Sequence, residues 1–267
     1  MDALPVKIWW AKRVFSLADK VGLVVGVADN RSIAWGCAKA FHDAGAEIAI
    51  TYVNGRAEPH VRVLAESVDA PIVAPLDVTN DAQMDSVFVE IDRTWGRLDF
   101  LLHSIAYCPK SDLHGRLVDV SLAGFQVAMD ISCHSFIRMI ARAEPRMKTG
   151  GSCLTVSYLG SERVVTNYGI MGPVKAALES TVRYAAAELG PKGITVNALS
   201  PGPLATRAAS GIAHFDALLD KAAERAPTHQ LSTIEDVGAH AVFLVSNGAR
   251  NVTGGVHHID GGYSITG

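Results

Sequence analysis

Short apolar runs alternate along the chain with longer segments in which apolar residues recur at helical spacing. The runs of strand length are Val21–Val27, Glu47–Tyr52, Pro71–Leu76, Phe100–His103, Ser152–Ser157, Thr195–Ser200 and a short one near His257–Ile259. The helix-like segments are Ser32–Ala44, a polar one through about Val68, Gly124–Lys148 and one from about Tyr168 to Leu189. Because strand and helix alternate regularly, we expect an α/β fold with a doubly wound parallel sheet and helices on both faces.

We expect a single domain to take up almost the whole chain. The sequence contains no internal repeat and no low-complexity linker, and α/β folds of this length often form one domain. We interpret residues 1–16 as an N-terminal extension and residues 17–267 as the domain, including a loop at about 201–215. Lysine and arginine interrupt every apolar run of the extension, so we expect no signal-peptide core there.

The composition narrows the functional classes. Of the 267 residues, 49% are hydrophobic, enough for a large core, and a net charge of −3 gives no basic face for DNA or RNA. No segment reaches 18 uncharged apolar residues, so we expect no membrane span. The four cysteines form no C-x-x-C pair and the histidines lack metal-ligand spacing. We therefore expect no metal site, no disulfide framework and a cytoplasmic location.

The turn after the first strand has features of a phosphate-binding turn. Gly26 lets the chain turn tightly, and Ser32 and Ile33 lie where a helix begins, so free N–H groups there would attract phosphate oxygens. The middle glycine of the G-x-G-x-x-G fingerprint is missing, and an ordinary strand-to-helix turn fits equally well.

Two further strand ends favour a dinucleotide. Asp77, with Val78 after it, ends the third strand and could accept a hydrogen bond from an adenine amino group. The alternative for Asp77 is a helix N-cap, a role that Asp81 could also fill. The run Ser104-Ile105-Ala106 ends the fourth strand with small residues that leave room for a ring or ribose. Ligands bind at such carboxyl ends in open α/β sheets.

Tyr168 and Lys175 are seven positions apart, and Tyr158 precedes Tyr168 by ten. Seven helical residues at about 100° each return to within roughly 20° of the starting direction. On one helical face, the ammonium could lower the pKa of the phenol and hold a ligand hydroxyl. Pro173 is tolerated only in a first turn, so the helix should start near Met171, which loosens this geometry for Tyr168. Taken alone, a tyrosine and a lysine at this spacing could also occur by chance.

Five motifs together point to a family. They are Gly26-Val-Ala-x3-Ser32-Ile33-Ala34, His103-Ser-Ile-Ala106, Met129-Asp-Ile-Ser132, Tyr168-x6-Lys175 with Tyr158 upstream, and Ala208-Ala-Ser-Gly211. From about Leu17 to Ile265 the chain resembles the short-chain dehydrogenase/reductase superfamily and, within it, the bacterial enoyl-acyl carrier protein reductases. Ordinary superfamily members carry Tyr-x3-Lys and an upstream serine, whereas Thr155 stands at the serine position here. The resemblance implies a Rossmann-like domain.

The resemblance also implies roles for individual residues. Tyr158, Tyr168 and Lys175 match the family's active-site tyrosines and lysine, and Cys108 and both tyrosines match its substrate contacts. The residues that match dinucleotide contacts are Gly26, Ala28, Ser32, Ile33, Asp77, Val78, Ser104, Ile105, Ala106, Lys175, Leu204, Ala205, Thr206, Arg207 and Ala208. The last five belong to a loop of small residues that suits a lid over an acyl chain; an exposed crossover loop is the alternative.

The activity implied by the resemblance is NAD(P)H-dependent reduction of the trans-2 double bond of enoyl thioesters in fatty acid biosynthesis. Tyr168 would donate a hydrogen bond to the thioester oxygen, and Lys175 would hold the nicotinamide ribose hydroxyls. Tyr158 would orient the acyl chain or assist proton delivery. The family also implies a homotetramer packed partly through Gly124–Lys148 and the helix that contains Lys175.

The substrate carrier is left open by the sequence. Ala213, Asp216 and Ala217 stand where the family presents basic residues to its acidic carrier protein. A coenzyme A thioester or a specialised carrier is therefore an alternative. Arg207 and Lys221 are the basic residues that could compensate.

The cofactor and the reaction class also have alternatives. Val53 and Asn54 stand where a 2′-phosphate would meet a basic residue, which favours NADH, but Arg56 is near and keeps NADPH open. A short-chain carbonyl or alcohol dehydrogenase is a second enzymatic hypothesis, since Thr155 could imitate the absent serine. A dinucleotide-sensing protein without turnover is a third, disfavoured by the presence of both tyrosines and the lysine.

Overall fold

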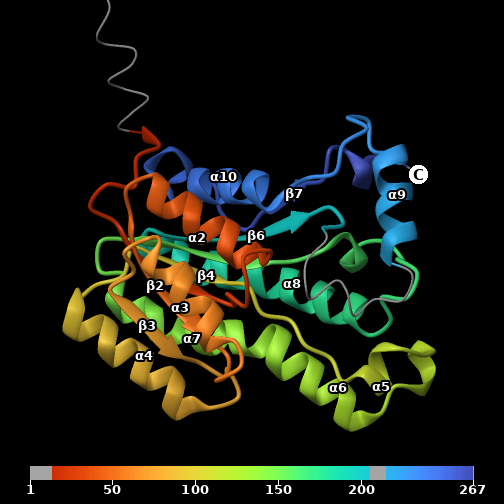
Figure 1. Cartoon of the computed structure of the whole chain (residues 1–267), viewed down its shortest axis with the longest axis horizontal. Helices are drawn as coiled ribbons and strands as arrows, with labels where there is room; N and C mark the ends of the chain where they lie inside the picture. Colours follow the sequence, from red (N-terminus) through yellow and green to blue (C-terminus); the bar gives the residue numbers. More distant parts are fainter. Residues whose placement is uncertain (1–13, 205–214, 267) are drawn as a thin grey trace, which may run out of the picture.

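A seven-stranded, fully parallel sheet forms the centre of the computed structural model, which describes residues 14–204 and 215–266 (Figure 1). The strand order is β3-β2-β1-β4-β5-β6-β7. The strands are β1 (Val21–Val25), β2 (Glu47–Tyr52), β3 (Ile72–Pro75), β4 (Phe100–His103), β5 (Gly151–Val156), β6 (Ile194–Pro201) and β7 (Val256–Ile259). The order reverses between β1 and β4, and this places a crevice at their carboxyl ends. The predicted doubly wound, Rossmann-like α/β fold is confirmed.

Helices cover both faces of the sheet (Figure 1). One face is covered by α2 (Ile33–Asp43), α3 (Glu58–Glu66) and α10 (Ile234–Val245). The other is covered by α4 (Asp81–Thr94), α7 (Ser135–Ala143) and α8 (Met171–Leu189). Three more helices lie beyond the carboxyl ends of the strands: α5 (Lys110–Leu113), α6 (Leu122–Met129) and α9 (Phe215–Arg225).

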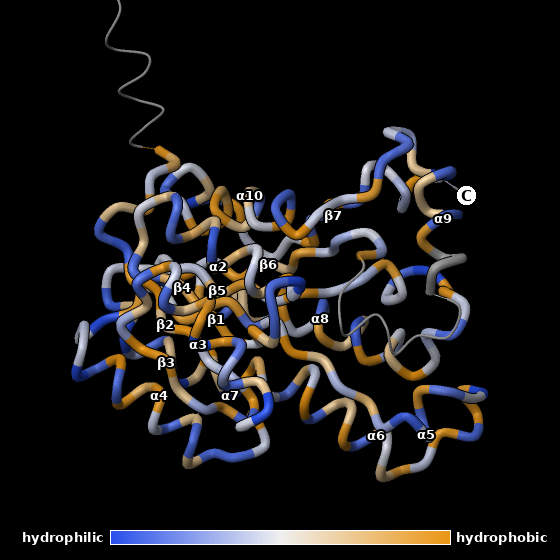
Figure 2. Tube along the Cα trace, viewed as in Figure 1, coloured by the Kyte–Doolittle hydropathy of each residue, from blue (hydrophilic) through white to orange (hydrophobic). Residues whose placement is uncertain are grey.

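The core consists of two apolar layers, one on each face of the sheet, and the apolar strands run between them (Figure 2). Every residue of β1 and of β6 is buried, as expected for strands that pack against helices on both sides. In one layer the rings of Phe41 and Phe100 have centroids 4.6 Å apart. This rigid sheet fixes the positions of the loops at its carboxyl edge. Among the described residues, no helix is long and apolar enough to cross a membrane.

The long helix predicted over Gly124–Lys148 is the main local correction. The observed helical segment begins at Leu122, contains a π-helical turn at Asp130–His134 and ends at Ala143, just before Pro145. Proline lacks an N–H and clashes with the preceding turn, so the helix cannot continue through it in α geometry. No proline or glycine marks the π-helical turn, and the apolar pattern alone gives no sign of it.

Candidate active site

Gly26 joins the ends of β1 and β4 at the crevice. Its φ is +109°, a conformation that favours glycine, and a Cβ there would lie 2.1 Å from the carbonyl oxygen of Ser104. The backbone N–H of Ser104 also donates to Val25 O at 2.9 Å. Only glycine therefore fits this turn, and it leaves a backbone cradle between the two strand ends.

Ser32 is the N-cap of α2, so a helix begins where the sequence predicts one. Its side chain makes no capping bond to the helix; the hydroxyl donates to Asp29 O at 2.6 Å and accepts from Ala28 N at 3.4 Å. The first turn of α2 has no acidic residue either. The first N–H groups of the helix, beginning near Ile33, thus lack a side-chain acceptor, and a phosphate oxygen would fit there.

Asp77 makes a local turn after β3 and does not cap a helix. Its Oδ1 accepts from the backbone N–H and the hydroxyl of Thr79, at 2.9 and 2.7 Å. The N-cap of α4 is Asn80, which accepts from Gln83 N, so the alternative roles considered for Asp77 and Asp81 were wrong. Val78 is buried in the adjoining core and Asp77 is half-buried.

His103, the last residue of β4, is fully buried in a hydrogen-bonded network below the crevice. Its Nδ1 lies 3.0 Å from Thr155 Oγ1, and its Nε2 lies 2.8 Å from Ser135 Oγ. Ser135 donates its one proton to Ile131 O at 2.6 Å, so Nε2 carries the ring proton and Nδ1 accepts from Thr155. Burial lowers the pKa of His103 to about 3, with a further contribution from the charge of Lys175.

The π-helical turn explains how the loop after β4 is held. It lets Ser132 accept from Tyr107 N at 2.9 Å and donate to Tyr107 O at 3.1 Å, while Ser135 reaches His103. Both serines thus fix the segment that carries Ser104, Ile105 and Ala106. Ser104 and Ile105 are half-buried and Ala106 is exposed. π-Helical turns are common at functional sites.

Tyr158 and Tyr168 meet above the end of β5. Tyr158 follows the strand, Tyr168 precedes α8, and their ring centroids are 5.0 Å apart at 63°. A Cβ on Gly160 would lie 2.3 Å from the ring of Tyr168, so glycine is required beneath it. The hydroxyl of Tyr158 is buried without a hydrogen-bond partner. Buried polar groups are almost always paired, so this hydroxyl is a candidate to bind a ligand.

Burial keeps both tyrosines protonated. It raises the pKa of Tyr158 well above the usual value, and the nearby Tyr263 adds to the effect. Burial also raises the pKa of Tyr168, followed by the effects of Tyr158 and Glu179. Lys175 does not contribute to the pKa of Tyr168, so the expectation that the lysine lowers it was wrong. Tyr168 is instead a neutral hydrogen-bond donor.

Lys175 is buried in the first turns of α8. The helix starts at Met171, with Pro173 in its first turn, as predicted. Lys175 Nζ donates to Val156 O at 2.6 Å. An ammonium has three donors, so two remain for other acceptors. Burial lowers the pKa of Lys175 to about 8, and Cys133 and Glu179 partly oppose the shift.

The remaining predicted residues fall into two groups. Cys108 is buried beside Ile170, Met171 and Val174 in a small apolar cluster that also contacts Tyr168. Burial raises the pKa of its thiol, so it is an apolar wall here and a poor nucleophile. Leu204 is buried in the core layer that includes α2 and α10. The positions Ala205, Thr206, Arg207 and Ala208 lie outside the described residues.

Glu179 is a site residue that the sequence reasoning missed. It is buried, lies one helical turn after Lys175 on α8, and accepts hydrogen bonds from Ser157 and Ser161 on either side of Tyr158. A charged residue four positions after Lys175 shares its helix face, and this spacing could have identified it.

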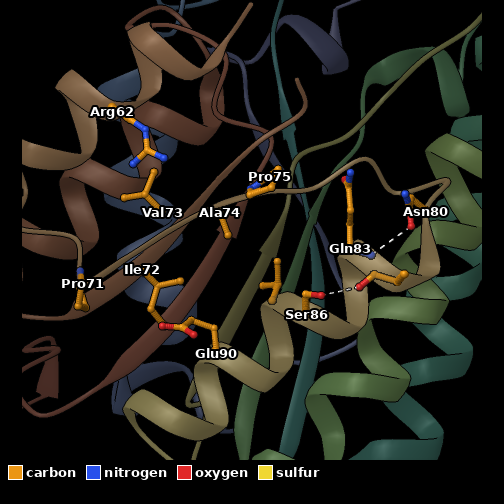
Figure 3. A pocket seen from close by; sticks show the side chains of 12 residues that line it. Arg62, Pro71, Ile72, Val73, Ala74, Pro75, Asn80, Gln83, Ser86 and Glu90 are labelled. Carbon is orange, nitrogen blue, oxygen red and sulfur yellow. Dashed lines mark hydrogen bonds between the residues drawn. The ribbon is translucent and has the colours of Figure 1, made fainter. Parts of the chain in front are cut away.

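A surface groove lies elsewhere, along the free edge of β3 between α3 and α4 (Figure 3). Its volume is about 600 Å³, and its polar side chains come from Arg62, Asn80, Gln83, Ser86 and Glu90. Four strand spacings of about 4.8 Å separate β3 from β5, so the groove is roughly 19 Å from the tyrosine pair. We therefore take the carboxyl edge of β1, β4 and β5, and not this groove, as the candidate active site.

Comparison with known proteins identifies the family of the chain. Residues 26–264 match the family model described as "Enoyl-(Acyl carrier protein) reductase". The chain is 46% identical over 248 residues to "Enoyl-[acyl-carrier-protein] reductase [NADH] 1" of Rhizobium meliloti, covering 93% of this chain and 91% of the relative.

Solved structures are similar as well. An enoyl-(acyl-carrier-protein) reductase from Anaplasma phagocytophilum in complex with NAD has a TM-score of 0.91 at 43% identity, covering 94% of this chain and 96% of that one. A Bacillus cereus enoyl-acyl carrier protein reductase with NADP+ and indole naphthyridinone has a TM-score of 0.92 at 45% identity, covering 94% and 98%.

Proposed function

The chain belongs to the enoyl-(acyl carrier protein) reductase family, and we propose that it uses NADH to reduce the trans-2 double bond of enoyl thioesters in fatty acid synthesis. The observation that carries the assignment of residues is the tyrosine pair beside a buried lysine. Tyr158 and Tyr168 are in edge contact, Lys175 is held by the strand end below them, and the Tyr158 hydroxyl has no partner within the chain.

The crevice fits a dinucleotide. Gly26 leaves a backbone cradle that any Cβ would fill, and the start of α2 offers N–H groups without a side-chain acceptor. Lys175 has two donors left for ribose hydroxyls. When bound, the reduced nicotinamide supplies a hydride to the β-carbon of the enoyl thioester.

The residues of the chain would stabilise the charge that develops on the thioester oxygen. Tyr168 is protonated and half-buried, so its hydroxyl can donate a hydrogen bond to that oxygen. The ammonium of Lys175 adds positive potential nearby and orients the cofactor. Tyr158 places a second protonated hydroxyl in the same buried space, where it orients the acyl chain or assists proton delivery. The apolar cluster around Cys108 excludes water from this side.

The carbonyl dehydrogenase alternative is weakened by Thr155. That reaction would need a free hydroxyl at this position, as the serine of ordinary superfamily members supplies. Thr155 is fully buried on β5 and donates its hydroxyl to His103. It therefore has no proton left for a substrate oxygen.

We propose acyl carrier protein as the carrier of the acyl chain and NADH as the electron donor. The Rhizobium meliloti relative carries both in its name, while the Bacillus cereus structure contains NADP+. Val53 is half-exposed at the end of β2, and Asn54 uses its side chain to accept from Arg56 N and Ala57 N. Neither Val53 nor Asn54 carries a positive charge for a 2′-phosphate, which favours NADH, and Arg56 is the cation that would have to turn toward such a phosphate.

We also propose a homotetramer that acts in the cytoplasm. Large apolar side chains are exposed on α6, α7 and α8, namely Phe125, Ile137 and Tyr184. These are the elements through which the family resemblance implies subunit packing. The cysteines at 37, 108, 133 and 153 are all free and buried, which suits a reducing compartment. Light scattering should give about four times the chain mass of 28.3 kDa.

One assay tests the proposed function. Absorbance at 340 nm is followed for NADH and for NADPH with crotonyl-coenzyme A, with a crotonyl carrier protein and with a simple ketone. Oxidation of NADH with the thioesters, fastest with the carrier protein, supports the proposal. Turnover of the ketone without turnover of either thioester overturns it.

A further inference from the structure

A buried carboxylate lies under the loop that carries Tyr158. Glu179 is only 5% exposed, and its Oε1 accepts hydrogen bonds from the hydroxyls of Ser157 and Ser161. The Ser161 bond is 2.6 Å long. Ser157 immediately precedes Tyr158, and Ser161 ends the short helical turn that follows it. One carboxylate oxygen therefore holds the chain on both sides of the active-site tyrosine.

Lys175 completes this arrangement from the same helix. It lies one turn before Glu179 on α8, and its Nζ donates to Val156 O at 2.6 Å. Val156 and Ser157 are consecutive, so α8 contacts the end of β5 twice. The Lys175 ammonium donates to the Val156 carbonyl, and the Glu179 carboxylate accepts from the Ser157 hydroxyl. The charge of Glu179 also favours the protonated form of Lys175.

Tyr158 needs such a support because its side chain has none of its own polar contacts. Its hydroxyl is buried without a partner, and its ring contacts Tyr168 and an apolar cluster containing Leu159 and Tyr263. Apolar contacts are not directional, so they fix the hydroxyl poorly. The direction of this hydroxyl is thus set mainly by the backbone of residues 157–161.

We propose that Glu179 is a positioning residue that, through Ser157 and Ser161, sets the orientation of Tyr158 for the enoyl thioester. The role in turnover rests on the proposed function, whereas the orientation itself is a property of the free protein. Glu179 is hydrogen-bonded to Ser157 and Ser161 and so acts on Tyr158 through the loop, while its charge also raises the pKa of Tyr168 and of Lys175. Lys175 remains anchored on Val156 without Glu179, so cofactor binding should depend on it much less than turnover does.

The first experiment observes Tyr158 directly, without any substrate. The chain has six tyrosines, so 3-fluorotyrosine labelling gives a ¹⁹F NMR spectrum simple enough to assign by single Tyr→Phe substitutions. We expect the Tyr158 signal to shift or split in Glu179→Gln and in Ser161→Ala, while the signal of the exposed Tyr184 stays in place. The matched control is Glu188→Gln, which changes an exposed glutamate on the same helix and should move neither the Tyr158 nor the Tyr184 signal. An unchanged Tyr158 signal in both Glu179→Gln and Ser161→Ala overturns the proposal.

The second experiment measures turnover in a double-mutant cycle. Glu179→Gln should lower kcat with crotonyl-coenzyme A about 10-fold in the native background, but less than 2-fold when Tyr158 is already Phe. The Kd for NADH, from fluorescence titration, should stay within about 2-fold. An equal loss in both backgrounds, or a loss of NADH affinity as large as the loss of kcat, would show a merely structural role. Failure of the wild-type chain to reduce any thioester would instead overturn the proposed function and leave the NMR result standing.

Discussion

The ring of Tyr158 packs edge-on against the ring of Tyr168, with the centroids 5.0 Å apart. The two residues reach this contact from different elements, one from the end of β5 and the other from the loop before α8. Both hydroxyls are kept protonated by burial. The pair therefore offers two neutral donors to one substrate, which suits an oxygen that gains negative charge during the reaction.

Tyr168→Phe should lower kcat with an enoyl thioester about 100-fold or more, because one donor to the developing negative charge is lost. The Kd for NADH should change less than 3-fold, since the proposed partner of this hydroxyl is the substrate oxygen and not the cofactor. Steady-state kinetics and a fluorescence titration measure the two quantities. Equal losses of kcat and of NADH affinity would show that Tyr168 acts in cofactor binding and not in the stabilisation of charge.

Lys175 should make cofactor binding pH-dependent. Burial lowers its pKa to about 8, so the ammonium is present below that pH and is lost as the pH rises through it. We expect the Kd for NADH to rise several-fold between pH 7 and pH 9.5 in the wild type. In Lys175→Met the Kd should be higher throughout and nearly flat over the same range. A flat profile in the wild type would contradict this role.

Gly26→Ala should cost roughly 2 kcal/mol or more of the free energy of unfolding, because the residue has a φ of +109° and its Cβ would meet Ser104 O at 2.1 Å. The Kd for NADH should rise at least 10-fold as the turn is displaced. Gly55→Ala is the control, since a Cβ there has nothing within 4 Å, and it should change stability by less than about 0.5 kcal/mol. Urea unfolding and NADH titration measure both variants.

His103 should make the protein less stable in acid. Its pKa is about 3 in the folded chain and 6.5 in the unfolded one, so only the unfolded chain binds this proton between those pH values. The contribution is complete above pH 6.5 and declines as the pH falls; from pH 7 to pH 5 the loss is about 2 kcal/mol.

The variant His103→Gln isolates that contribution, because glutamine keeps a donor and an acceptor but does not titrate. Urea unfolding at pH 7 and at pH 5 should show a loss about 2 kcal/mol larger for the wild type than for the variant. Equal losses would mean that the His103 network with Thr155 and Ser135 admits a proton in the folded state.

Local patterns were sufficient to predict most of the sheet. Glu47–Tyr52 and Phe100–His103 have the predicted bounds, because turn and charged residues flank short apolar runs. The start of α8 at Met171 followed from Pro173 alone. The helices α4 and α10 were not singled out, although Asn80 and Thr233 cap them with ordinary signals.

The long-range contacts of the site could not be predicted in the same way. The His103 network joins residues 32 and 52 positions apart, and its geometry depends on a π-helical turn that no local residue type announces. Motif spacing was sufficient to name Tyr158, Tyr168 and Lys175 as candidate site residues. The hydrogen bond from Lys175 to Val156 O could not be predicted, because it depends on how α8 packs against the end of β5.

The most direct test of the central claim is the position of hydride transfer. The protein is incubated with crotonyl-coenzyme A or a crotonyl carrier protein and NADH deuterated at C4 of the nicotinamide, and the product is analysed by NMR. The account predicts a saturated butyryl thioester with deuterium on its β-carbon. Deuterium on a carbinol carbon, formed from a ketone substrate while the enoyl thioester is left unreduced, would contradict it.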